Sequence, residues 1–229
     1  MYNTRPLNYL FTIDDMKFGI IGSGNIGGTL GIHLATAGHH VMFSARNPEK
    51  LQGLVKKAGI NATAGSVEEA AVFGEVILLA VPFKAVPSLH EKIGDLDGKV
   101  LIDANNYYPA RDGEGPGDEL RSKTLLESQW TGSYFKGASV VKAFNTIDYK
   151  TLSNRAFPVT GKPPLVIPFA TSDEKADQVI LKILKDIGFE GFKVGGLSAT
   201  RITQPGGTLY GRYLSKTEME KLIKAPSIE

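Results

Sequence analysis

The chain has 229 residues, of which 42% are hydrophobic and 22% are charged. This composition is typical of a globular protein with one well-packed domain, with or without an appendage. The 26 basic and 24 acidic side chains nearly cancel, so no global field favours nucleic acid or an anionic membrane as a partner. The absence of cysteine excludes disulfides, thiolate metal sites, iron–sulfur ligation and a cysteine nucleophile.

The remaining polar residues suggest no metal chemistry. The four histidines show no ligand spacing, and His39-His40 is typical of a solvated corner, so we predict no metal site. No apolar run reaches the ~18 residues that cross a bilayer, and the first fifteen residues lack the pattern of a secretion signal. We therefore expect a cytoplasmic protein with a disordered extension over 1–15, and neither membrane nor nucleic acid among its partners.

The first predicted element is a short apolar strand that runs into Gly22-Ser23-Gly24-Asn25-Ile26-Gly27, a Gly-x-Gly-x-x-Gly turn that opens an apolar-periodic helix. In such a turn Gly22 permits the tight bend, Gly24 lets a pyrophosphate approach the backbone, and Gly27 lets the helix lie close on the strand. The free N–H groups and positive dipole end of the helix then face the anion. A glycine-rich turn alone is weak evidence, but the flanking strand and helix favour a dinucleotide site at these six residues.

The rest of the chain alternates short Val/Ile/Leu runs with helix-period segments, which is typical of a parallel sheet covered by helices on both faces. Further strands are expected at 41–44, 61–63, 76–81, 99–103, 139–144, 165–170 and, at an edge, 189–194. We predict an α/β fold with a doubly wound, Rossmann-type, mainly parallel sheet, helices on both faces and a short C-terminal extension. The expected domain covers 16–196, and 197–229 packs on it.

Helices are expected between these strands. The first ends at Gly38, a good left-handed cap, and others are predicted at 48–58, from 66, and from Thr217. A capping box formed by Thr171 and Glu174 opens a further helix that Gly188 closes. The Gly- and Pro-rich segment 107–121 indicates a long loop, and loops of this length are usually functional or disordered.

The end of the second strand distinguishes between the two nicotinamide cofactors. An NAD site normally carries Asp or Glu there to bind the ribose 2′-hydroxyl, whereas this strand ends in Ser44-Ala45-Arg46. Ser44 offers a hydroxyl, and Arg46 offers a planar fork of donors suited to a 2′-phosphate. Lys50 opposes the dipole of the next helix unless an anion is bound nearby. We therefore predict NADP(H), bound here by Ser44, Ala45, Arg46 and Lys50; alternatively, Ser44 and Arg46 only solvate a loop.

In a doubly wound sheet the nicotinamide lies across the carboxyl ends of the strands beyond the first. The residues at those ends are 80–83, 103–106 and 142–146. Val81 and Pro82 are expected to pack on the ribose and nicotinamide, although Pro82 is equally well explained as a strand stop. This edge of the sheet is therefore the predicted reaction site.

At these positions the chain resembles a known family. The segments 17–30, 44–46 and 80–83, and above all Val140-Val141-Lys142-Ala143-Phe144-Asn145-Thr146-Ile147, are similar to the NADPH-dependent reductases of the deazaflavin coenzyme F420. They also resemble the cytosolic oxidoreductase domain of the six-transmembrane metalloreductases. The likeness covers most of 17–196, whereas the segments 107–121 and 204–207 depart from the archaeal reductases and leave the acceptor open.

The resemblance implies a compact, often dimeric domain that binds NADP and stacks a flavin-like acceptor on the nicotinamide in an open cleft. It implies that Ser44 and Arg46 hold the 2′-phosphate. It also implies that the hydride-transfer site is lined by Ala80, Val81, Pro82, Phe83, Ala143 and Asn145.

We therefore predict an NADP(H)-dependent oxidoreductase that transfers a hydride to or from a small flavin-like or deazaflavin (F420) acceptor, in a homodimer. Such a transfer needs orientation more than a protein acid or base, so no catalytic residue is assigned. A non-catalytic NADP(H)-binding redox sensor and an imine or carbonyl reductase stay open as alternatives. The side chains available to protonate a carbonyl or imine are Asp103, Lys142, Asn145 and the pair Tyr107-Tyr108.

Overall fold

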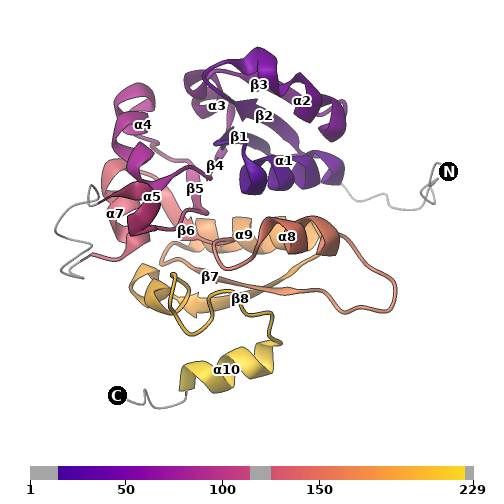
Figure 1. Ribbon diagram of the computed structural model, residues 1–229, viewed down its shortest axis with the longest axis vertical. Helices are drawn as coiled ribbons and strands as arrows, with labels where there is room; N and C mark the ends of the chain where they lie inside the picture. The colour runs from indigo at the N-terminus through magenta and orange to yellow at the C-terminus, as the bar shows by residue number, and fades with distance from the viewer. Residues whose placement is uncertain (1–14, 114–124, 225–229) are drawn as a thin grey trace.

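The computed structural model describes residues 15–113 and 125–224, and the predicted disordered extension over 1–15 lies almost wholly outside them. Within this part of the chain one eight-stranded sheet has the order β3-β2-β1-β4-β5-β6-β7-β8 (Figure 1). The strands are β1 (Lys17–Ile21), β2 (His40–Ser44), β3 (Ala62–Gly65), β4 (Val76–Leu79), β5 (Val100–Asp103), β6 (Ser139–Lys142), β7 (Val166–Ala170) and β8 (Glu190–Gly195). All neighbours pair in parallel except β6 and β7, which are antiparallel. The predicted fold class is confirmed.

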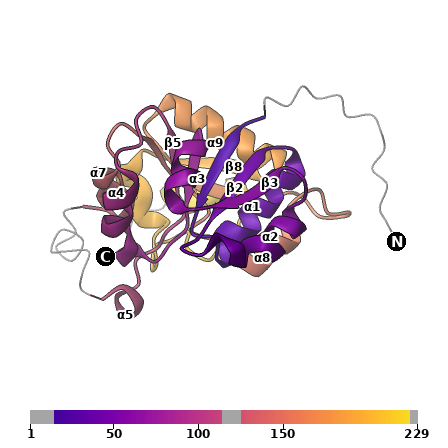
Figure 2. The same cartoon turned by 90° about the horizontal axis from the view of Figure 1, so that it is seen from above.

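Helices cover both faces of this sheet. The 3-10 helices are η1 (Pro48–Leu51), η2 (Phe83–Ala85) and η3 (Leu197–Ile202), and the α-helices are α1 (Asn25–Ala37), α2 (Gln52–Ala58), α3 (Val67–Phe73), α4 (Val86–Ile93), α5 (Pro109–Asp112), α7 (Glu127–Tyr134), α8 (Tyr149–Arg155), α9 (Glu174–Asp186) and α10 (Lys216–Lys224). In both views α4, α5 and α7 lie together at one side of the molecule, away from α1 and α2 (Figure 1 and Figure 2). Among the described residues, no helix combines the length and apolarity needed to cross a membrane.

Two apolar cores follow from the alternation of side chains along the strands. In β4, Val76 and Leu78 join the core beneath α1, α8 and α9, whereas Ile77 and Leu79 join the core beneath α3, α4 and α7. Successive residues of a strand point to opposite faces, so a run that is apolar at every position must be covered on both sides. This is why the sequence pattern of 76–79 predicts a central strand correctly.

Two local expectations are wrong. The cap of α9 is Asp173, whose carboxylate accepts the Ala176 N–H, because the Thr171 hydroxyl instead donates to the Val140 carbonyl at 2.8 Å. His39 is fully buried, since its ring packs on Phe18 and its Nε2 lies 3.2 Å from an Asp186 oxygen. Burial lowers the pKa of His39, and Asp186 partly counters this effect.

The segments outside the regular alternation also differ from the prediction. The C-terminal helix is capped by Ser215 rather than opened by Thr217. The Ser215 N–H donates to the Glu218 carboxylate, and the Glu218 N–H donates to the Ser215 hydroxyl. Of the predicted loop 107–121, residues 109–112 form α5, and 114–121 lie outside the described residues. The segment after η3 is bound to the sheet edge, since the Asn145 amide donates to the Thr203 carbonyl at 2.7 Å. The division of the chain at 196 stays a prediction.

Candidate functional site: a glycine turn and a cleft at the strand ends

The three glycines of the turn after β1 differ in what surrounds them. Gly22 has a φ of +97°, and a Cβ there would lie 2.3 Å from the Ala80 carbonyl oxygen. A Cβ on Gly27 would lie 2.1 Å from the Gly22 oxygen. A Cβ on Gly24, in contrast, would meet nothing within 4 Å. Gly22 and Gly27 are therefore required by the fold itself, whereas packing does not explain Gly24.

Helix α1 begins at this open space. Its N-cap is Gly24, which offers no side-chain acceptor, and no acidic residue lies in the first turn. The first N–H groups of a helix need an acceptor, and the dipole makes that end electropositive. Ser23 takes no part in this cap, because its hydroxyl pairs with the backbone of Ser44, 3.0 Å from the oxygen and 3.1 Å from the nitrogen. The helix terminus near Asn25 and Ile26 is therefore a candidate anion site.

The end of β2 presents Arg46, and η1 directly after it presents Lys50 beside Glu49. Arg46 and Lys50 are exposed, and Ala45 is half-buried. The Ser44 hydroxyl is buried and donates to the Ile20 carbonyl at 2.7 Å, so it has no proton left for a phosphate. The expected donor set at this end is thereby reduced to the two basic side chains and the backbone.

A cleft of about 450 Å³ lies at the carboxyl ends of β1, β4, β5 and β6. The main contributors from the predicted set are Asn25, Ile26, Ala80, Val81, Pro82 and Asn145. Phe144, which also lines it, has a φ of +63°. A non-glycine residue in this region is strained, and such strain gathers at functional sites.

Two predicted lining residues do not reach this cleft. Phe83 is fully buried and stacks on Trp130, with ring centroids 4.7 Å apart. Pro82 turns the chain into η2, and this turn directs the Phe83 ring into the second core. Ala143 is also fully buried, in the core on the other face. Both assignments are corrected: Phe83 and Ala143 support the site from behind.

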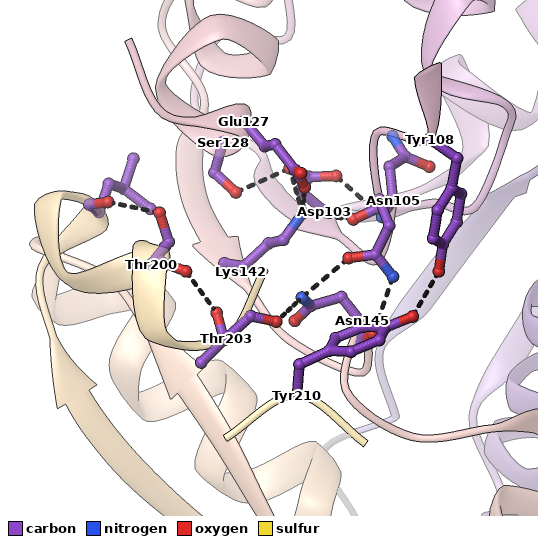
Figure 3. Close-up of polar contacts among 12 residues, drawn as sticks. Asp103, Asn105, Tyr108, Glu127, Ser128, Lys142, Asn145, Thr200, Thr203 and Tyr210 are labelled. Atoms are coloured by element: carbon purple, nitrogen blue, oxygen red, sulfur yellow. Dashed lines mark hydrogen bonds and ion pairs between the residues drawn. The ribbon is translucent and has the colours of Figure 1, made fainter. Parts of the chain in front are cut away.

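A buried ionic cluster lies beneath the cleft. Lys142 is 1% exposed and its Nζ lies 3.3 Å from an Asp103 oxygen and 3.6 Å from a Glu127 oxygen. It also donates to the Asn105 carbonyl, and the Ser128 hydroxyl donates to Asp103 at 2.8 Å (Figure 3). Burial raises the pKa of Glu127 to about 7, and the nearby Lys142 partly opposes this shift. Asp103 and Lys142 are thus buried away from the cleft and unsuited to protonate an acceptor. The sequence analysis does not identify Glu127 as a member of this cluster.

Amide side chains form the floor above this cluster. The Asn105 Oδ1 accepts the Val81 N–H at 2.8 Å, and the Asn145 Nδ2 donates to Asn106 at 3.1 Å. Within the described part of the chain, the buried Asn145 Oδ1 and Asn105 Nδ2 have no hydrogen-bond partner. Buried polar atoms are normally satisfied, so these two are candidates for ligand contacts.

The outer wall of the cleft is aromatic and comes in part from the C-terminal segment. Tyr108 and Tyr210 share a hydrogen bond between their hydroxyls, and the Arg111 guanidinium lies 4.9 Å from the Tyr108 ring centroid. Tyr149 and Tyr213 add exposed rings to the same rim. No sequence signal marked Tyr210, because its segment lacks the periodicity that identifies an element. Over the residues with described placement, no group of three metal-binding side chains occurs.

The fold and the glycine turn define a class: the Rossmann-type domains. Residues 17–107 match a family model described as NADP oxidoreductase, coenzyme F420-dependent. The F420-dependent NADP reductase of Methanothermobacter marburgensis is 26% identical over 211 residues, which cover 82% of this chain and 88% of that protein. The predicted resemblance to these reductases is confirmed.

Two further comparisons agree. Metalloreductase STEAP3 of Rattus norvegicus is 29% identical over 186 residues, which cover 81% of this chain and 35% of that protein, so the chain spans about a third of its length. The crystal structure of a hypothetical protein, SMa0349 from Sinorhizobium meliloti, superposes with a TM-score of 0.75 at 26% identity and covers 87% of this chain and 95% of that one. The homologues and the fold are those of NADP-dependent oxidoreductases.

An imine reductase from Pseudomonas sp. shares the fold alone. Its TM-score is 0.55 at 16% identity, and the match covers 80% of this chain but 56% of that one.

Proposed function

We propose that this protein is an NADP(H)-dependent oxidoreductase that exchanges a hydride with a planar, flavin-like or deazaflavin acceptor. One observation carries the proposal: the open space at Gly24 faces an uncapped helix terminus, where a pyrophosphate fits and nothing else in the described structure uses the glycine. The donor set agrees, because Arg46 is exposed after the end of β2, Lys50 is exposed in η1, and β2 itself ends in Ser44 rather than in a carboxylate.

Each part of the site has a role in this proposal. The backbone of 22–27 binds the pyrophosphate, and Arg46 with Lys50 binds the 2′-phosphate. Ala80, Val81 and Pro82 support the ribose and the nicotinamide, which when bound supplies the hydride chemistry. The free Asn145 Oδ1 accepts an N–H from the ligand.

The acceptor side supports a planar partner. Tyr149 is 40% exposed and Tyr213 is 46% exposed at the rim of the cleft. Exposed aromatic rings gain by stacking on another flat ring, because both surfaces leave water. The relatives named as F420-dependent NADP reductases act on such a ring. A homodimer and a cytoplasmic location stay predictions.

Ligand-induced thermal stabilisation tests the cofactor first. NADP⁺ or NADPH at 100 times its dissociation constant should stabilise the fold by ~2.7 kcal/mol, and NAD⁺ or NADH at the same concentration should have a smaller effect. NADPH oxidation is then followed by the absorbance of the reduced nicotinamide with riboflavin, 5-deazariboflavin, a ferric chelate and a cyclic imine. Turnover with the flavin types supports the proposal; turnover with the imine alone contradicts it. Strong nucleotide binding without turnover indicates a sensor.

A further inference from the structure

The Tyr108–Tyr210 pair joins two distant parts of the chain at the mouth of the cleft. Tyr108 precedes α5 and Tyr210 belongs to the C-terminal segment, and both rings line the cavity (Figure 3). Their hydroxyls form one hydrogen bond, in which either oxygen can be the donor. Two phenols carry two protons and this bond uses one, and within the described residues no acceptor binds the second. The pair therefore holds one O–H group in reserve.

The surroundings of the pair favour its protonated form. Burial raises the pKa of Tyr210 far above its usual range, and its contact with Tyr108 acts in the same direction. The Arg111 guanidinium, held at 2.8 Å by the Asp112 carboxylate, lies over the Tyr108 ring and favours negative charge on the pair. Glu127 is the other charged group that acts on Tyr210, and it opposes ionisation.

Two other protic groups at the cleft are engaged elsewhere. The Tyr213 hydroxyl donates to Asp148 at a short distance of 2.5 Å. Hydrogen bonds from Thr151 and then Tyr213 hold the pKa of Asp148 far below its usual range, so it has no proton to give at neutral pH. Lys142 is enclosed by Asp103 and the Asn105 carbonyl.

We infer that the Tyr108–Tyr210 pair is the proton donor to the acceptor, and that the acceptor carries a carbonyl oxygen conjugated with the atom that receives the hydride. This inference rests on the proposed function. The acceptor gains a hydride at its electrophilic atom, and the displaced π electron pair moves to the oxygen. That oxygen takes the phenolic proton, and water in the open cleft returns a proton to the pair. The sum is NADPH, acceptor and one proton giving NADP⁺ and the dihydro acceptor.

Two substitutions and two acceptors test the assignment. Tyr210→Phe and Tyr108→Phe each remove one hydroxyl, and Tyr134→Phe, on α7 and outside the lining of the cleft, is the matched control. With 5-deazariboflavin, whose ring carries conjugated carbonyls, kcat should fall ~10²-fold in both paired variants, as for the loss of one donor to a developing oxyanion. With N-methylacridinium, a flat hydride acceptor that takes up no proton, the rates should match the wild type.

A binding measurement distinguishes the loss of a hydrogen bond to the acceptor from a change in the shape of the cleft. In the presence of NADP⁺, the Kd of 5-deazariboflavin should rise about 10-fold in Tyr210→Phe, as for a lost hydrogen bond, and that of N-methylacridinium should not change. Equal losses with both acceptors, or no loss with either, would overturn the proton-donor role. A wild type that binds NADPH but reduces neither acceptor would instead overturn the proposed function and this inference with it.

Discussion

The cleft has two ends, which we call the nucleotide end (22–27 and the end of β2) and the acceptor end (the residues after β5 and β6 and the C-terminal segment) after their proposed ligands. The first is formed mainly by backbone and the second by side chains. At the end proposed for the nucleotide, the backbone of 22–27 contributes most and Arg46 and Lys50 add side chains. Gly22 and Gly27 are required by packing, whereas Gly24 borders open space. At the acceptor end, side chains from three distant segments meet: Asn105 after β5, Asn145 after β6, and Tyr210 beyond η3. A site formed by the backbone depends on one backbone conformation, whereas a site formed by side chains can acquire a different ligand through substitutions. The cofactor should therefore be the fixed partner and the acceptor the variable one.

The largest effect is expected at the support of the acceptor end. Lys142→Met leaves the buried carboxylates of Asp103 and Glu127 without their shared cation. Breaking a buried ion pair from one side costs about 3–5 kcal/mol, so the free energy of unfolding, measured in urea, should fall by that amount. Lys150→Met, at an exposed position of α8, should change it by less than about 0.5 kcal/mol. A similarly small loss for Lys142→Met would show that the cluster does not hold this end together.

The glycines of the nucleotide end give the next largest effect. Gly27→Ala places a Cβ 2.1 Å from a backbone oxygen, and overpacking of this kind should cost about 3 kcal/mol of stability. Gly24→Ala, where the space is open, should leave stability within about 0.5 kcal/mol. It should still weaken NADPH binding more than ~10-fold, because the methyl group occupies the place of the pyrophosphate. Calorimetric binding and thermal unfolding of both variants measure the contrast.

A stable Gly24→Ala protein that binds NADPH as the wild type does would refute the role of this space.

The sequence predicts these two ends unequally, and the physical reason is the range of the interactions. The strand–glycine–helix unit is local, so the pattern alone predicts 22–27 and the end of β2 as a nucleotide site. The Ser44 hydroxyl was misjudged because its partner, the Ile20 carbonyl, lies on the neighbouring strand. Residues after a strand end have no periodicity, so nothing in the sequence shows that Pro82 faces the cleft and Phe83 faces Trp130.

The acceptor end depends on the packing of segments that share no local signal. Glu127 reaches Lys142 only because α7 lies against β6, and Tyr210 reaches Tyr108 only because the C-terminal segment returns to the strand ends. Both contacts join residues far apart in the chain. In the sequence, nothing distinguishes Glu127 from an ordinary surface residue or Tyr210 from an ordinary core residue.

Arg46→Ala tests the choice between the two cofactors. A charged hydrogen bond contributes ~1.5–3 kcal/mol, so the substitution should weaken NADPH binding ~10-fold to 100-fold and leave NADH binding unchanged. Arg46→Lys keeps the charge without the planar fork and should give an intermediate loss. Titration calorimetry with both nucleotides measures the ratio. Equal losses for NADPH and NADH would mean that Arg46 does not contact the 2′-phosphate.

The smallest expected effect is a pH dependence that belongs to the acceptor end alone. Burial raises the pKa of Glu127 to about 7 in the folded chain, above its usual 4.5. The folded state therefore holds a proton that the unfolded state releases, and the protein loses stability as pH rises from about 4.5 to about 7. When Glu127 ionises, Asp103 and Glu127 share one cation, and the cluster carries an excess negative charge in a buried place.

Glu127→Gln removes that charge and should abolish the loss. Relative to the wild type, the variant should gain about 1–3 kcal/mol in the free energy of unfolding between pH 5 and pH 8. Glu49→Gln, at an exposed position of η1, should leave the pH profile unchanged. If Glu127→Gln and the wild type lose stability in parallel over this range, another group titrates, and the Lys142 cluster does not limit the stability of the acceptor end. NADPH affinity should be equal in both proteins, because Arg46 and the glycine turn lie outside the cluster.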